Sequence, residues 1–249
     1  MLRTLSLASL FISTLVVGCA AEEPTTPGSD ELAGENGQDG EVPKADGVDN
    51  FGFMSVTAMH AVCNNPLFCV NYKLERVNRT TTQCVFGNTA ANCPVRGISW
   101  DLLGLSKAKV DTIEAAIAHS TDATGPQVLV RGSFKSFIEF TMFQPTEVWV
   151  AQRSGGSTDG TFVRIFDRGI RCITAPCPQF AEGRLNSTRT AVIDGIDFGV
   201  SAEDSLQQRT YDATSKPDGV IIVGDRTTRA VQSYSEKYRS VQQVFLRLN

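Results

Sequence analysis

Side chains that commonly do catalytic chemistry are few in this 249-residue chain and form no known catalytic pattern. The two histidines, His60 and His119, have no partner at metal-ligand spacing, so we expect no metal site. There is no Gly-x-Ser-x-Gly nucleophile motif, no phosphate-binding loop and no Gly-x-Gly-x-x-Gly dinucleotide motif. We therefore expect neither catalytic activity nor a cofactor. A hydrolase without a recognisable motif is the alternative.

The cysteines can do a different chemistry, and the first of them follows an export signal. Arg3 gives a short positive region, and the apolar run from Leu5 to Val17 is too short to span a bilayer as a helix. The Val-Val-Gly-Cys string ending at Cys19 resembles a bacterial lipobox, which implies cleavage before Cys19 and its lipidation. An ordinary secretory signal with a chance cysteine is the alternative. Two or three acyl chains anchor a protein durably. Because Ala20 stands where an aspartate would indicate inner-membrane retention, we expect the outer membrane of a Gram-negative cell.

The segment after the lipidated cysteine has the composition of a disordered tether. Residues 20–50 contain nine acids against Lys44, a net charge of −8, and no aromatic residue. Such a segment cannot bury enough apolar surface to offset its ordering entropy. A binding role for the acidic run is the alternative. Residues 51–249 hold 21 basic and 18 acidic residues, about +3, which argues against a nucleic-acid-binding protein.

The remaining six cysteines are an even number in an exported chain, which predicts three disulfides. The stretch Cys63 to Cys69 resembles Cys172 to Cys177, and Asn78 or Asn186 stands nine residues after each pair. Cys69 and Cys177 differ by 108 positions, as do Asn78 and Asn186, whereas Gly97 and Gly195 differ by 98, so the first copy carries ten extra residues. The insertion spans Cys84 to Cys93 and most simply pairs its own cysteines. The predicted disulfides are Cys63–Cys69, Cys84–Cys93 and Cys172–Cys177.

The duplication continues to the end of the chain, where Val148-Trp149-Val150 matches Val244-Phe245-Leu246. We therefore predict a signal peptide (1–18), a lipidated tether (19–50), a first repeat (51–152), a Gly/Ser-rich linker (153–160) and a second repeat (161–249). We expect few contacts across the linker and independent folding of each repeat. Asn78 and Asn186 both begin glycosylation sequons, which we expect to be unmodified. Their repeated position predicts turns in which side chains bond nearby backbone.

Hydrophobic patterns predict a mainly β fold with short helices. In the first copy we expect strands near 53–62, 68–77, 97–102, 127–134 and 147–152. A helix begins at the cap Ser106 and ends by Gly125, and the second copy has a shorter helix over about 201–209. Three strands, a helix and two strands is the order of an OB-fold, so we predict two tandem OB-like small barrels, with another β-dominated duplicate as the alternative.

Five arginines gather around the disulfide of the second copy and mark a possible binding face: Arg164, Arg168, Arg171, Arg184 and Arg189. OB barrels often bind extended polymers on strands two and three. In a cell envelope this polymer would be a glycan, a peptide or an anionic lipid. A solvated charged face without a ligand is the alternative.

The Cys-x4-Cys-Pro string from Cys172, in a lipidated and duplicated chain, resembles a family of myxobacterial-type lipoproteins to which no activity is assigned. The resemblance spans most of residues 53–249. We expect a non-enzymatic envelope lipoprotein with a binding or scaffolding role, held on the membrane through Cys19, whose partner is an envelope glycan, peptide or protein. A proteinase inhibitor that presents the Cys172–Cys177 loop is an alternative, because a rigid loop lowers the cost of binding.

Overall fold

The computed structural model describes residues 52–59, 69–120, 124–136, 140–152, 157–200, 203–231 and 233–249. The predicted signal peptide, the lipidation site Cys19, the acidic tether, His60, Cys63 and linker residues 153–156 lie outside these ranges. Among the described residues, no helix is both long and apolar enough to cross a membrane.

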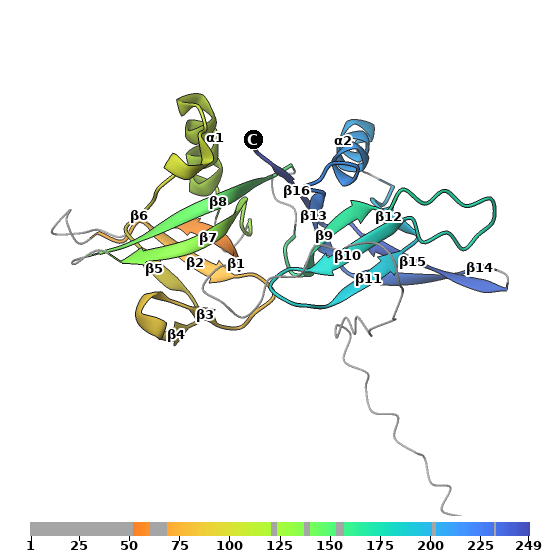
Figure 1. Cartoon of the computed structure of the whole chain (residues 1–249), viewed down its shortest axis with the longest axis horizontal. Helices are drawn as coiled ribbons and strands as arrows, with labels where there is room; N and C mark the ends of the chain where they lie inside the picture. Colours follow the sequence, from red (N-terminus) through yellow and green to blue (C-terminus); the bar gives the residue numbers. More distant parts are fainter. Residues whose placement is uncertain are drawn as a thin grey trace, which may run out of the picture.

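The chain is mainly β, as predicted, and each repeat contributes one α-helix (Figure 1). The first repeat contains β1 (Gly52–Ala58), β2 (Tyr72–Arg76), β3 (Thr82–Gln83), β4 (Thr89–Ala90), β5 (Cys93–Val95), β6 (Gly97–Ile98), α1 (Lys107–Ala118), β7 (Val128–Ser136) and β8 (Thr141–Ala151). The second contains β9 (Thr161–Asp167), β10 (Phe180–Arg184), β11 (Thr190–Ile193), β12 (Gly195–Asp197), α2 (Asp204–Thr214), β13 (Val220–Gly224), β14 (Arg226–Val231), β15 (Tyr234–Ser240) and β16 (Gln243–Arg247).

Both helices lie on the same side of the sheet and bury one apolar stripe each (Figure 1). Ser106 precedes α1 as predicted, and Ile113 and Ile117 are the buried positions. The second helix begins and ends later than the predicted range of about 201–209. Leu206 and Ala213 explain this shift, because they lie two turns apart and are both buried in the core of the second repeat.

The two repeats have the same strand order. In the first, the antiparallel order is β5-β2-β1-β7-β8; in the second, it is β11-β10-β9-β13-β16. In each, the short strand before the helix runs parallel to a later strand: β6 pairs with β8, and β12 pairs with β15. The β7–β8 hairpin of the first repeat is continuous, whereas in the second the corresponding hairpin is divided into β13–β16 and β14–β15.

A single sheet runs through both repeats, because β16 pairs antiparallel with β8. Leu246 lies opposite Val150, and Phe245 and Arg247 lie opposite Ala151 and Trp149. The sequence matches Leu246 with Val150, so equivalent residues of the two repeats face each other. The expectation that few contacts join the repeats is wrong. The strands at the equivalent edges of the two repeats, β8 and β16, pair with each other and join both repeats into one 11-stranded sheet.

Three hydrophobic clusters form the core. One belongs to each repeat and packs beneath its helix. The third, here called the central cluster, lies on the opposite face of the shared strands and takes residues from both repeats: Phe53, Val77, Leu129, Trp149, Phe162, Leu185, Ile221, Val223 and Phe245. Side chains alternate between the faces of a strand, so β8 gives Val148 to the first core and Trp149 to the central cluster.

Two equivalent asparagines reinforce the junction. Asn78 and Asn186 are the described non-glycine residues with positive φ, 58° and 56°, which places both in the predicted turns. Asn186 accepts a hydrogen bond from the backbone N–H of Phe53 (2.8 Å) and donates to the carbonyls of Phe53 (2.8 Å) and Val77 (2.9 Å). Asn78 makes the equivalent bonds to the second repeat. It accepts a hydrogen bond from the backbone N–H of Phe162 (2.9 Å) and donates to the carbonyls of Phe162 (2.8 Å) and Leu185 (3.1 Å).

The predicted bonds from these asparagines to nearby backbone are therefore wrong: each amide bonds the other repeat. Composition around a turn cannot reveal a partner more than 80 residues away.

The structure contains two of the three predicted disulfides, Cys84–Cys93 and Cys172–Cys177. Cys69 is also disulfide-bonded, and its predicted partner Cys63 lies outside the described residues. Cys84 and Cys93 are buried, whereas Cys172 is exposed.

Candidate functional site

The five arginines singled out from the sequence do not share one face. In the β9–β10 pairing, Arg164 lies opposite Gly183, and the next residue, Arg184, lies opposite Val163. Adjacent residues of a strand point to opposite faces, so Arg164 and Arg184 are on different sides of the sheet. Arg164 is largely buried in the middle of the molecule, whereas Arg189 is exposed in the β10–β11 turn. A single binding face made of all five arginines is therefore excluded by the strand register.

Arg168 and Arg171 instead fasten the loop between β9 and β10. Arg168 donates to the carbonyl of Pro178 (2.9 Å), and Arg171 makes a two-bond ion pair with Asp167 (2.7 and 3.0 Å). Asp167 also accepts from the backbone N–H of Gly169 (2.7 Å). The Arg171 guanidinium is the main cause that holds the pKa of the Asp167 carboxyl below its usual value. These bonds and the Cys172–Cys177 disulfide hold the loop at its base.

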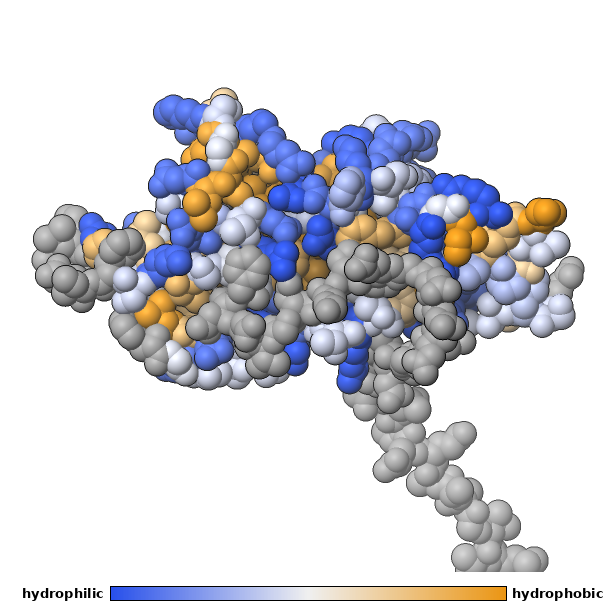
Figure 2. Space-filling model, viewed as in Figure 1, coloured by the Kyte–Doolittle hydropathy of each residue, from blue (hydrophilic) through white to orange (hydrophobic). Residues whose placement is uncertain are grey.

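Beyond that base the loop projects into solvent. Residues 171–176 are all exposed, and the Ile173 side chain is fully so, with a relative exposed area of 102%. Figure 1 shows the loop extending from the second repeat at the right, and Figure 2 shows hydrophobic atoms at that end of the molecule. The Ile173 side chain therefore contributes nothing to the core and is available for contact with another molecule.

A second candidate lies on the face of the sheet that carries the central cluster. Three arginines and two acids form a network, here called the arginine cluster: Arg131, Glu147, Arg164, Asp218 and Arg247. Glu147 binds Arg131 (Nη1 to Oε1, 2.9 Å), accepts from the Trp149 indole (3.1 Å) and lies 4.0 Å from Arg164. Asp218 pairs with Arg247 and lies 3.8 Å from the Arg164 guanidinium.

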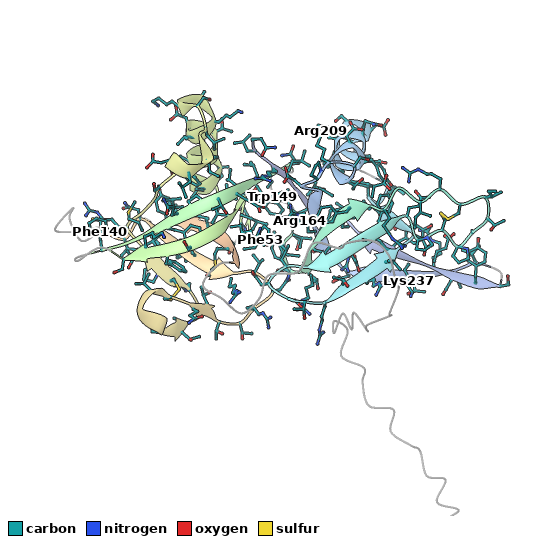
Figure 3. All side chains as sticks on the ribbon, viewed as in Figure 1. Phe53, Phe140, Trp149, Arg164, Arg209 and Lys237 are labelled. Carbon is teal, nitrogen blue, oxygen red and sulfur yellow. A yellow bond between two sulfur atoms is a disulfide. The ribbon has the colours of Figure 1, made fainter. Side chains whose placement is uncertain are left out.

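Arg164 is the centre of this network. Its guanidinium lies 5.1 Å from the centre of the Trp149 ring, and its Nε donates to the carbonyl of Asp218 (2.7 Å). Figure 3 shows Phe53, Trp149 and Arg164 together between the two repeats. Burial lowers the pKa of Arg164, the charges of Glu147 and Asp218 oppose this, and the nearby Arg131 and Arg247 lower it further.

At the symmetry-equivalent place, which also takes residues from both repeats, the counterparts of four of these five residues are uncharged. Phe53, Arg131 and Glu147 lie opposite one another across β1, β7 and β8, and the same register across β9, β13 and β16 gives Phe162, Val223 and Gln243. The β8–β16 register likewise makes Ala151 the counterpart of Arg247. The position of Arg164, two residues after Phe162, corresponds to Ser55. The fold can thus be built at this place without ions.

Sequence reasoning found only Arg164 among these five residues. The others stand in separate strands and turns, and no local motif joins them. The available signal was the comparison of the repeats, since Arg131 of the first copy stands at the position of Val223, and Arg247 of the second copy stands at that of Ala151.

A fully buried ion pair elsewhere in the second repeat is explained by comparison with the core of the first repeat. Arg239 binds Glu182 through two bonds (2.9 and 2.8 Å), and neither side chain is exposed. By register, Glu182 corresponds to Leu74 and Arg239 to Phe143, two buried members of the first core. An ion pair in one repeat therefore occupies the place of an apolar contact in the other.

The described part of the chain contains no set of side chains that could coordinate a metal ion. No group of three or more His, Cys, Asp or Glu side chains within these ranges could hold a metal ion. His119 is exposed at the end of α1, where its Nδ1 lies 2.6 Å from the carbonyl of Ala115.

Comparison with known proteins places the chain in a family. A family model described as a domain of unknown function, DUF6748, matches residues 53–249, which are both repeats together. No curated protein and no solved structure matches the chain. The match begins at the first strand and ends at the last residue, as expected if the two repeats form one unit. The chain therefore belongs to the DUF6748 family.

Proposed function

We propose that this protein is an exported, lipid-anchored binding protein without catalytic activity, and that the β9–β10 loop contacts its macromolecular partner. The observation that carries the proposal is the Ile173 side chain, which is fully exposed at the end of a disulfide-closed loop. Exposing an isoleucine costs solvation free energy, and the fastened base reduces the entropy lost on binding. The partner is a glycan, peptide or protein of the cell envelope.

The OB-like description of each repeat belongs to the same proposal. Supporting it are the strand order three-two-one-four-five, the helix between strands three and four, and the parallel pairing after strand three. The disulfides support an oxidising compartment such as the periplasm or the cell exterior. The lipobox supports attachment to the outer membrane through Cys19.

Two experiments test this proposal. Cys19→Ser should move the protein from the membrane to the soluble fraction, and acyl mass on Cys19 should disappear. If the variant still sediments with membranes and the wild type carries no lipid, the anchor is refuted.

The loop is tested by placing a photo-crosslinking amino acid at position 173 in cells. A discrete adduct should form there and disappear when the loop disulfide is removed by Cys172→Ser with Cys177→Ser. The control position is Val200, whose side chain is equally exposed outside the loop. Equal labelling at 173 and 200, or none at 173, would contradict a binding role of the loop.

A second candidate function, a proteinase inhibitor, is favoured by the same side chain. Arg171 is occupied by Asp167, so Ile173 is the loop residue available to enter the primary pocket of a protease. The protein should then inhibit proteases that accept aliphatic residues. Ile173→Arg should shift inhibition to trypsin-like enzymes, whereas no inhibition in either form, or rapid cleavage of the loop, would exclude this function.

A further inference from the structure

The strand β14 ends the three-stranded sheet of the second repeat and has an open edge. In the described part of the chain, β15 is the only strand that pairs with it, and Figure 1 places it at the right-hand end of the molecule. Four of its six residues, Thr227, Thr228, Arg229 and Ala230, are exposed. An open edge presents backbone N–H and C=O groups that can pair with another strand.

The neighbouring strand shows which residues of β14 face outward. Thr228 lies opposite Lys237, whose backbone N–H and carbonyl are both bonded to Asp194 on the other side of β15 (2.7 and 2.8 Å). Opposite residues of an antiparallel pair exchange both backbone bonds or neither, so the N–H and carbonyl of Thr228 point away from β15. Because this direction alternates along a strand, Arg226 and Ala230 share it.

The other end strands of the described sheets are protected against such pairing. Very short strands are one natural protection of an edge: β5, β11 and β12 have three or four residues, and β3, β4 and β6 have two. β5 also contains the exposed Pro94, and the Val192 carbonyl of β11 accepts a hydrogen bond from Arg226 (2.9 Å). β14 is longer than these strands and contains no proline.

The charges on β14 are held by groups of their own chain. Arg226 lies 3.7 Å from Glu182, and Arg229 lies 3.6 Å from Asp197. The Arg229 guanidinium also lies 4.8 Å from the centre of the Tyr238 ring. Charged side chains can protect an edge, but both arginines are directed to partners within this chain, which leaves the backbone edge accessible.

We propose that the β14 edge pairs with the same edge of a second copy of this chain. The chain already contains a junction of this kind, because the equivalent strands β8 and β16 pair antiparallel with Val150 opposite Leu246. Two copies of one strand can pair in the same way about a twofold axis. The proposal does not depend on the function of the β9–β10 loop.

The sequence of β14 selects one register for this pairing. Outward-facing residues must lie opposite each other, so the axis passes through a residue of the strand. An axis at Thr228 places Arg226 opposite Ala230, and it places Arg229 opposite Thr227, so no like charges meet. An axis at Arg229 would set two arginines directly opposite each other, which is destabilising. An axis at Thr227 would leave half of the strand without a partner.

Cysteine crosslinking of the full-length chain in cells tests this register. One strand makes a small interface, so the dimer is weak and is trapped covalently. Thr228→Cys puts a thiol on the axis, where the Cα atoms of the two copies are about 5.5 Å apart and a disulfide can form. Ala230→Cys is the matched control. It is equally exposed and faces the same edge, but its Cα atoms would be about 14 Å apart.

After mild oxidation with copper phenanthroline, Thr228→Cys should give a product of twice the chain's mass that reduction separates. Peptide mapping should assign the new disulfide to position 228. Ala230→Cys should remain monomeric under the same conditions.

A proline variant tests the backbone bonds without a crosslink. Thr228→Pro removes the outward N–H and leaves the bonds to β15 in place, whereas Thr228→Val keeps that N–H. In concentration-dependent sedimentation of the soluble Cys19→Ser protein, Thr228→Pro should weaken self-association by about tenfold or more, because the pair on the axis exchanges two hydrogen bonds. Thr228→Val should associate like the protein with Thr228.

The proposal is refuted if the two cysteine variants crosslink alike or if neither forms a dimer. A Thr228→Cys product with the mass of a different protein would also refute it, since the occupant of the edge would then be a strand of that protein. Thermal melting establishes that each variant is folded. If Thr228→Pro fails to fold, the comparison of the two cysteine variants decides.

Discussion

Val150 in β8 lies directly opposite Leu246 in β16, and the two residues occupy the same position in their respective repeats. Antiparallel pairing of equivalent strands, with equivalent residues face to face, is the arrangement of a twofold-symmetric dimer interface. Here one chain supplies both halves. The junction also contains the central cluster, to which both repeats contribute, and the reciprocal bonds of Asn78 and Asn186.

Loss of the Asn186 amide should destabilise the whole chain. Asn186→Ala leaves the N–H and carbonyl of Phe53 and the carbonyl of Val77 without this partner, and it strains a residue at φ 56°. We expect a loss of about 2–4 kcal/mol in the free energy of unfolding, measured with denaturant. Asn186→Gly removes the bonds but tolerates the positive φ, so the difference between the variants isolates the strain. A loss below about 0.5 kcal/mol for both would show that these bonds contribute little.

The buried Glu182–Arg239 pair should be replaceable by its counterpart from the first repeat. Glu182→Leu or Arg239→Phe alone leaves a buried charge without its principal partner and should cost about 3–5 kcal/mol. The double variant introduces the residues that the first core has at these positions, Leu74 and Phe143, but it also removes the ion pair of Glu182 with Arg226, so it should recover part of that loss. Additive losses in a double-mutant cycle would mean that the two places are not equivalent.

The two described disulfides should differ in their importance for stability. Replacing Cys84 and Cys93 together with serine puts two hydroxyls into buried positions as well as opening the loop. The same change at Cys172 and Cys177 affects a largely exposed loop and should cost about 2 kcal/mol or less. Comparing thermal melts of the two double variants tests this order, and a larger loss for the 172/177 variant would reverse it.

Alkaline pH should destabilise the fold through its tyrosines. Burial, and then the hydrogen bond to Glu114, raise the pKa of Tyr72; the hydrogen bond to Glu236, and then burial, raise the pKa of Tyr238 to about 12. The unfolded chain loses these protons first, so stability should fall as the pH rises above the ordinary tyrosine value of about 10. Denaturation curves between pH 9 and about 11 should show a shallower fall for Tyr72→Phe than for the wild type. Parallel curves would contradict this assignment.

Much of the fold could be predicted because its signals are local. Alternating apolar residues indicated the main strands, Ser106 marked the start of α1, and the insertion between the copies indicated the Cys84–Cys93 pairing. The junction of the repeats could not be predicted, because β8 and β16 present the same apolar alternation whether they pair with each other or remain at two separate edges.

Of the two candidate sites, one could be predicted from the sequence and the other could not. The Cys172–Cys177 loop is visible in the sequence because its cysteines are five residues apart. The arginine cluster is not, because Arg131, Arg164 and Arg247 come from three strands that only the shared sheet brings together.

The most direct test of this account is the thermal melting of the second repeat alone. A fragment of residues 161–249 lacks β8, Asn78 and four of the nine members of the central cluster, so its share of that cluster is exposed to water. We predict no cooperative transition for this fragment, none for residues 51–152, and a cooperative transition when the two are mixed in equal amounts. A cooperative transition of 161–249 on its own, at the temperature found for 51–249, would contradict the claim that the two repeats share one core.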